Sequence, residues 1–121
     1  MMKNFLLVGL GGALGSMGRY GISLLASSIG WTAFAGTLTA NVIGSFLIGL
    51  IYAACASGSW QLMLTVGFCG GFTTFSTFSH QSLSLIQQGN MGMALGYMLC
   101  SFVACLLFVW LGMQLGQQMG S

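Results

Sequence analysis

Hydrophobic residues fill four long stretches of the chain, and short polar segments (ASSIG, ASGS and QQGN) separate them. Each stretch is long enough, at roughly 20 residues, to cross the hydrocarbon core of a bilayer as a helix. Because the separators are so short, consecutive helices are predicted to be antiparallel neighbours. The predicted helices run from Phe5 to Leu25, Thr32 to Ala54, Leu62 to Ile86 and Met93 to Leu115. The pattern therefore predicts an all-α membrane protein, with one four-helix transmembrane domain over residues 1–121.

The third stretch contains an unusual run from Gly67 to Ser79, GFCGGFTTFSTFS, in which glycine and hydroxyl residues interrupt the apolar pattern. In lipid every backbone N–H and C=O needs a partner, so a break at the glycine pair, followed by Thr73 and Thr74, requires surrounding protein or water. Carbonyls and amides exposed by a break are ready ligands for a small ion. We therefore predict that the third helix is broken here, beside a pore or a binding site.

Three phenylalanines of this run follow at helical spacing, at positions 72, 75 and 78. Phe75 and Phe78 are expected to share one face of the helix, and their ring edges carry partial positive charge. Such ring edges can attract an anion electrostatically. Packing of the same rings against lipid or a neighbouring helix explains the spacing equally well.

A polar stripe with a period of four residues marks the second helix. It consists of Thr37, Asn41, Ser45 and Gly49. An asparagine near the middle of a membrane is costly unless it is hydrogen-bonded. Asn41 either bonds to a neighbouring backbone and fixes helix packing, or its amide donates to a passing anion.

A second narrow polar face, on the fourth helix, combines Tyr97, Ser101 and Cys105. It could complete a polar track with Asn41, although ordinary interhelical hydrogen bonds account for it as well. The first helix carries the pair Gly11 and Gly15, whose GxxxG spacing permits close approach of another backbone.

The composition excludes several classes of mechanism. The chain is 56% hydrophobic and has two basic residues and no Asp or Glu. Proton-coupled transport, metal transport with acidic ligands and carboxylate catalysis all need an acid, so we expect no enzyme and no multidrug exchanger of the small four-helix type. The cysteines have no metal-site spacing and are predicted to be small, buried apolar residues. We expect no nucleic-acid partner.

The two basic residues are Lys3 and Arg19. Arg19 either extends to the membrane interface or raises the local concentration of anions at a pore mouth. Orientation in a membrane follows the distribution of Lys and Arg near helix ends, and here the bias is almost nil. The chain is therefore predicted to insert both ways up, and two copies would then pair as an antiparallel dimer.

Three motifs together resemble the Fluc, or CrcB-type, fluoride channels. They are GGALGSMGRY (11–20), GTLTANVIGSFLIG (36–49) and GFCGGFTTFSTFS (67–79). The resemblance implies an antiparallel, dual-topology homodimer in the cell (inner) membrane. It also implies two narrow pores that export fluoride passively, and a structural sodium ion at the dimer interface.

The resemblance also assigns roles to residues. It places the backbone carbonyls of Gly70 and Thr73 on the sodium ion and Arg19 in the vestibule. The implied fluoride pore consists of Asn41, Phe75, Phe78, Ser76, Thr77, Tyr97 and Ser101.

Two departures from the family pattern keep alternatives open. Gln81 stands where the family commonly has a glutamate, and the loop QQGN lacks the usual charges. The chain could be one subunit of a heterodimeric fluoride channel, or a non-transporting membrane assembly subunit.

Overall fold

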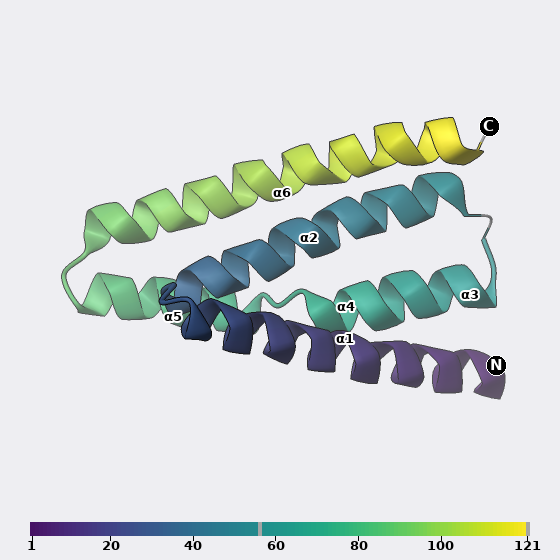
Figure 1. Cartoon of the computed structure of the whole chain (residues 1–121), viewed down its shortest axis with the longest axis horizontal. Helices are drawn as coiled ribbons and strands as arrows, with labels where there is room; N and C mark the ends of the chain where they lie inside the picture. The colour runs from purple at the N-terminus through teal and green to yellow at the C-terminus, as the bar shows by residue number, and fades with distance from the viewer. Residues whose placement is uncertain (56, 121) are drawn as a thin grey trace.

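The computed structural model describes residues 1–55 and 57–120, and this part of the chain contains helices and no strands. Four long helical rods lie side by side, each antiparallel to the next in sequence, so both termini lie at the same end (Figure 1). The third rod consists of four short segments. The elements are α1 (Met2–Ser28), α2 (Ala33–Ala54), α3 (Ser59–Leu62), η1 (Met63–Cys69), α4 (Gly70–Phe72), α5 (Ser76–Gln87) and α6 (Met91–Gly120). The predicted all-helical class is confirmed.

Three of the four rods are long and apolar enough to cross a membrane, and they comprise Ala33–Ala54, Ser59–Gln87 and Met91–Met119. The sequence had predicted four such spans. Although α1 has 27 residues, it is not among the three, because glycine, serine and the two basic residues make it less apolar. The first and fourth rods also extend beyond their predicted ends, since a helix can continue past its apolar part into polar surroundings.

Two of the short connections rely on a glycine in the left-handed region, Gly30 with φ 83° and Gly89 with φ 85°. Each follows a helix end, where a residue of positive φ lets the chain reverse while it satisfies the last carbonyls. After α1, the N–H of Trp31 donates to the carbonyl of Ala26 at 2.8 Å. These turns bring α1 against α2 and α5 against α6.

Glycines hold α1 close to the third rod. A Cβ on Gly71 would lie 2.6 Å from the carbonyl oxygen of Gly12, and a Cβ on Gly15 would collide with the carbonyl oxygen of Phe68. Gly11 is packed against the same rod in the same way. The close approach predicted from Gly11 and Gly15 is confirmed. It depends on glycine, because any side chain would separate the two backbones.

A second glycine contact joins α2 to α6. A Cβ on Gly112 would collide with the carbonyl oxygen of Phe46, and one on Gly116 would lie 2.6 Å from that of Leu50. Gly49 of the polar stripe on α2 packs against the backbone at Val109. We call these two contacts, α1 with the third rod and α2 with α6, the glycine seams. They fix α1 and α6 on opposite sides of the centre of the molecule.

Non-helical backbone in the third rod begins later than the glycine pair. Gly70 is helical, with φ −63° and ψ −37°, whereas Thr73 is extended, with φ −86° and ψ 158°. Helix resumes at Ser76. The glycine pair therefore does not bend the chain; Gly71 instead admits the backbone of α1. The seven-residue π-helical segment η1, which directly precedes α4, was not predicted from the sequence.

Candidate functional site

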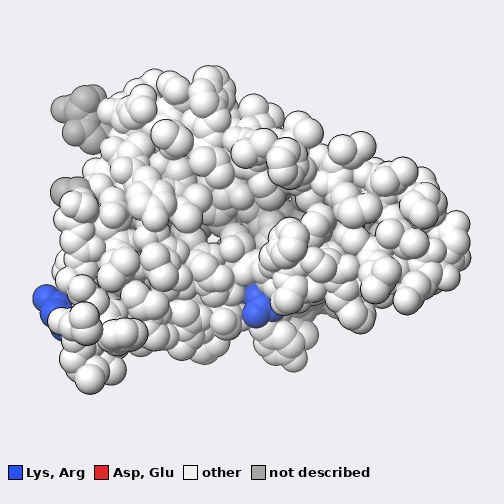
Figure 2. Space-filling model, turned by 180° about the vertical axis from the view of Figure 1, so that it is seen from behind, with Lys and Arg blue, Asp and Glu red and all other residues white. Residues whose placement is uncertain are grey.

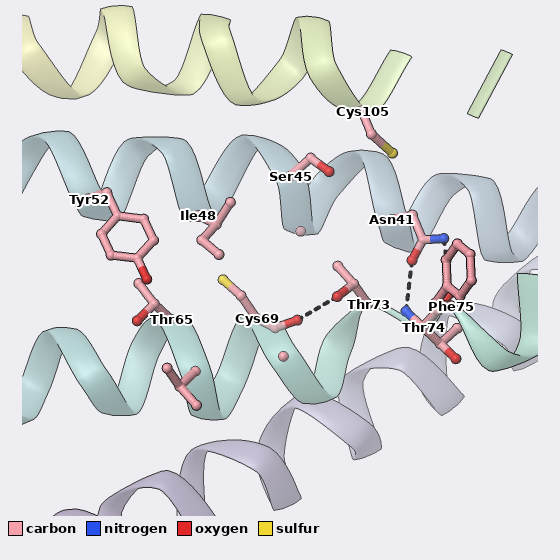
Figure 3. A pocket seen from close by; sticks show the side chains of 13 residues that line it. Asn41, Ser45, Ile48, Tyr52, Thr65, Cys69, Thr73, Thr74, Phe75 and Cys105 are labelled. Carbon is pink, nitrogen blue, oxygen red and sulfur yellow. Dashed lines mark hydrogen bonds between the residues drawn. The ribbon is translucent and has the colours of Figure 1, made fainter. Parts of the chain in front are cut away.

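The non-helical segment at residues 73–75 is held by the side chain of Asn41 from α2 (Figure 3). The backbone N–H of Thr74 donates to Asn41 Oδ1 at 2.9 Å, and Asn41 Nδ2 donates to the carbonyl of Thr74 at 3.2 Å. One side chain thus satisfies both backbone groups of a residue outside the helix. The bond to a neighbouring backbone that was considered for Asn41 is observed. An amide nitrogen carries two hydrogens, so one further donor remains for another acceptor.

Other backbone groups near the interruption have different partners. Thr73 donates its hydroxyl and its N–H to the carbonyl of Cys69, at 2.9 and 3.0 Å. Arg19 donates from Nε to the carbonyl of Gly71 at 3.2 Å. In the described part of the chain, no donor reaches the carbonyls of Gly70 and Thr73.

A cavity of about 580 Å³ brings together four of the predicted pore residues: Asn41, Phe75, Phe78 and Ser101. Its other walls are apolar side chains of α6, spaced at helical intervals. They are Met98, Phe102, Cys105, Leu106 and Val109. Of these, only Cys105 was singled out from the sequence. Ser101 is 5% exposed, and its hydroxyl has no hydrogen-bond partner among the described residues.

Aromatic rings continue from this cavity in an unbroken row. The ring centroids of Phe75 and Phe78 are 5.5 Å apart, those of Phe78 and Tyr97 are 5.1 Å apart, and those of Tyr97 and Phe34 are 5.3 Å apart. All three pairs are tilted, with interplanar angles of 44° to 53°, so the rings are neither stacked nor perpendicular. Phe34 was not anticipated. The hydroxyl of Tyr97 donates to Gln81 Oε1 at 3.0 Å.

A second hollow, of about 510 Å³, shares three wall residues with the cavity: Asn41, Phe75 and Cys105. Gly70 and Thr73, the predicted sodium ligands, line only this hollow. Figure 3 shows it between α2 and the third rod, with Asn41 and Phe75 at one end and Tyr52 at the other. Phe75 is 77% exposed in the single chain, although it lines both spaces.

The remaining predicted pore residues do not line the cavity. Ser76 is exposed, and its hydroxyl lies 3.4 Å from that of Thr74. Thr77 is half-buried, and its N–H donates to the hydroxyl of Thr74 at 3.3 Å. Tyr97 stands beside the cavity, with its ring against that of Phe78.

The expectation of four buried cysteines is only partly correct. All four are free; Cys69 is buried and Cys105 is half-buried, whereas Cys55 and Cys100 are exposed. Cys55 follows α2 in a connection, and Cys100 lies on an outward face of α6. Within the described residues, no group of three metal-binding side chains forms.

Full charges are scarce on the molecule. Figure 2 shows two separate blue groups and no red on the face in view, as expected for a chain with two basic residues and no acid. No charged side chain lines the cavity or the hollow. Any ion there would meet uncharged groups alone, namely amide, hydroxyl, thiol, aromatic and aliphatic side chains and the backbone.

Residues 6–113 match the family model described as CrcB-like protein, Camphor Resistance (CrcB). The chain belongs to the CrcB-like family. A relative from Listeria monocytogenes serotype 4b (strain F2365), named "Fluoride-specific ion channel FluC 1", is 44% identical over 117 residues, which is 96% of this chain and 99% of the relative.

Two further relatives carry the name "Fluoride-specific ion channel FluC". The one from Thermus thermophilus is 46% identical over 120 residues, covering 95% of this chain and 96% of the relative. The one from Shewanella amazonensis is 44% identical over 119 residues, covering 94% and 96%. The resemblance inferred from the three motifs is confirmed, and this CrcB-like chain is a multi-pass membrane protein.

Proposed function

We propose that this CrcB-like protein is a fluoride-selective ion channel, not an enzyme, and that it passes fluoride across the cell (inner) membrane passively. Relatives that match it over nearly their whole length are named fluoride-specific ion channels. The cavity between α2, α5 and α6 supplies the chemistry that such a channel needs.

The observation that carries the proposal is the buried hydroxyl of Ser101, which has no partner among the described residues. Ser101 lines the cavity together with Asn41, Phe75 and Phe78. Buried polar groups are nearly always hydrogen-bonded, so an unpaired one suggests a missing ligand. Fluoride is small and strongly hydrated, and a pore must replace its water with donors yet release it again. Hydroxyl, amide and ring-edge donors without a fixed cation meet both needs.

The channel is proposed to be an antiparallel homodimer with one pore along each subunit, and α1 is proposed to cross the membrane with the other three rods. Phe75 lines both spaces, yet it is 77% exposed in the single chain. A second copy would cover it. The nearly absent orientation bias of Lys3 and Arg19 permits that copy to insert the other way up.

A sodium ion is proposed to lie between the two copies, held by the carbonyls of Gly70 and Thr73. These oxygens have no donor in the described part of the chain, and Gly70 and Thr73 line the same hollow as Phe75. Hard cations prefer oxygen ligands, and uncharged carbonyls suffice for a monovalent ion. Two carbonyls from each copy would make a cage that neither copy has alone. The ion would stabilise the non-helical segments.

The test is fluoride efflux from liposomes that contain only the purified protein, with chloride efflux as the selectivity control. Phe75→Ile should lower fluoride efflux without preventing dimer assembly. Phe5→Ile is the matched control, because Phe5 is 69% exposed on α1 and lines neither space. Fast fluoride-selective efflux that Phe75→Ile suppresses would support the proposal. Absence of efflux from a folded dimer would refute a homomeric channel and leave a heterodimer subunit or an assembly subunit.

Sodium is tested separately, by replacing it with a large organic cation on both sides of the membrane. We expect weaker dimers or slower efflux. If neither changes, the central sodium site is wrong, whereas the channel proposal stands.

A further inference from the structure

We propose that Arg19 is a positioning residue, which keeps the third rod open beside the pore by donating from Nε to the carbonyl of Gly71. The bond spans 3.2 Å and joins α1 to α4. The inference rests on the proposed channel function, since Arg19 holds α4 directly before the non-helical segment whose Phe75 lines the cavity. It differs from the expectation that Arg19 acts at a vestibule through its charge alone.

The carbonyl of Gly71 needs an external donor because the helix stops. In a continuous α-helix it would accept from the N–H four residues later, that of Phe75. The helical path ends at Phe72, and among the described residues the donor to Gly71 is the guanidinium of Arg19. Arg19 therefore satisfies the freed carbonyl of Gly71, as Asn41 satisfies the backbone groups of Thr74. An unsatisfied carbonyl would favour reclosing the helix.

Packing holds Arg19 in the position that this bond requires. A Cβ on Gly15 would lie 2.8 Å from the N atom of Phe72, and a Cβ on Gly18 would lie 3.2 Å from its ring. Phe72, the last helical residue before the non-helical segment, therefore packs against Gly15 and Gly18, in the turn of α1 just before Arg19. The side chain is half-buried there rather than extended into solvent.

The identity of the donor atom allows charge and hydrogen bonding to be separated. In arginine, Nε is bonded to Cδ, and in glutamine the amide nitrogen is bonded to Cδ as well. Arg19→Gln therefore keeps a donor at the position of Nε and removes the charge. Arg19→Lys keeps the charge but has a methylene at that position, and Arg19→Met keeps neither.

Fluoride efflux from liposomes should follow the donor and not the charge. We expect Arg19→Gln to remain close to wild type and Arg19→Lys and Arg19→Met to fall by about tenfold or more, which is the scale of one lost charge-assisted hydrogen bond. Lys3→Gln removes the other basic residue and should have no effect. Retained efflux in Arg19→Lys with loss in Arg19→Gln would overturn the proposal in favour of charge attraction. Equal loss, or no loss, in all three variants would overturn it as well.

A second readout does not depend on conduction. The sequence contains two Gly-Phe pairs, Gly67–Phe68 and Gly71–Phe72. Labelling glycine carbonyls with ¹³C and phenylalanine amides with ¹⁵N therefore gives two correlated NMR signals, one of which is an internal control. The Gly71 carbonyl signal should move upfield in Arg19→Met and Arg19→Lys and stay in place in Arg19→Gln, while the Gly67 signal stays in all. An unmoved Gly71 signal in Arg19→Met would refute the bond. If wild type conducts no fluoride, the channel function fails, and the carbonyl signal still decides on Arg19.

Discussion

Asn41→Asp changes one atom at the centre of the site and makes the sharpest test of the cavity as an anion pathway. The carboxylate keeps the acceptor for the N–H of Thr74, which lies 2.9 Å from Oδ1. It loses the donor to the carbonyl of Thr74 and places a second oxygen where Nδ2 lay, 3.2 Å from that carbonyl oxygen. The lost hydrogen bond and the repulsion between oxygens would weaken the non-helical segment by about 1–3 kcal/mol.

The charge has the larger effect on permeation. A fluoride ion in the cavity would pass within about 4 Å of the carboxylate, and two like charges at that distance repel by about 4 kcal/mol at an effective dielectric constant of roughly 20. This energy corresponds to a reduction of about 1000-fold in occupancy. Conduction should therefore be nearly abolished at neutral pH, well before the protein unfolds.

The assay is fluoride efflux from liposomes as a function of pH, with protein-free liposomes subtracted at each pH. As the pH falls and the new carboxyl group binds a proton, it regains a donor and loses its charge, so efflux should recover. Asn4→Asp is the control, since the side chain of Asn4 accepts a hydrogen bond from Ser59 at 2.8 Å, its one bond among the described residues, and does not line the cavity. Wild-type efflux from Asn41→Asp at neutral pH would refute an anion pathway beside this residue.

Three other outcomes follow from the same geometry. Ser101→Ala removes the unpartnered hydroxyl and should lower fluoride efflux by about tenfold while the dimer persists, because one donor to the anion is lost; unchanged efflux would exclude Ser101 from the pathway. Gly15→Ala would place a methyl group against the backbone of Phe68 and should destabilise the fold by about 1–3 kcal/mol in thermal unfolding in detergent. Gly9→Ala, with no neighbour within 4 Å, should be neutral. Equal stability of the two variants would contradict the close contact proposed between α1 and the third rod. Tags on the C-terminus should be accessible from both sides of the membrane, and one-sided access would exclude dual topology.

The sequence predicted the helices better than the site. Apolar runs located all four rods, because a long apolar run bounded by polar turns is a local property of the chain. The same patterns selected Asn41, Phe75, Phe78 and Ser101, which the cavity brings together. They did not select Phe34, which continues the aromatic row, because a single ring near a helix start gives no periodic signal.

The glycine pair shows the limit of local patterns. Two adjacent glycines suggest a break, yet Gly70 and Gly71 are helical, and the chain departs from the helix at Thr73. Glycine has two uses in a membrane helix, flexibility and close contact, and the sequence does not distinguish them. The contact of Gly71 with Gly12 decides between them here.

By itself the sequence determined that this is a glycine-rich helical membrane protein with almost no charge and with a hydroxyl-rich and phenylalanine-rich run in its third rod. Composition and periodicity suffice for that, because burial in lipid acts on each helix separately. Only the tertiary structure decided which groups satisfy the non-helical segment. Asn41 and Thr74 are 33 residues apart and Arg19 and Gly71 are 52 apart, so these bonds exist only once the glycine seams have set the helices in place.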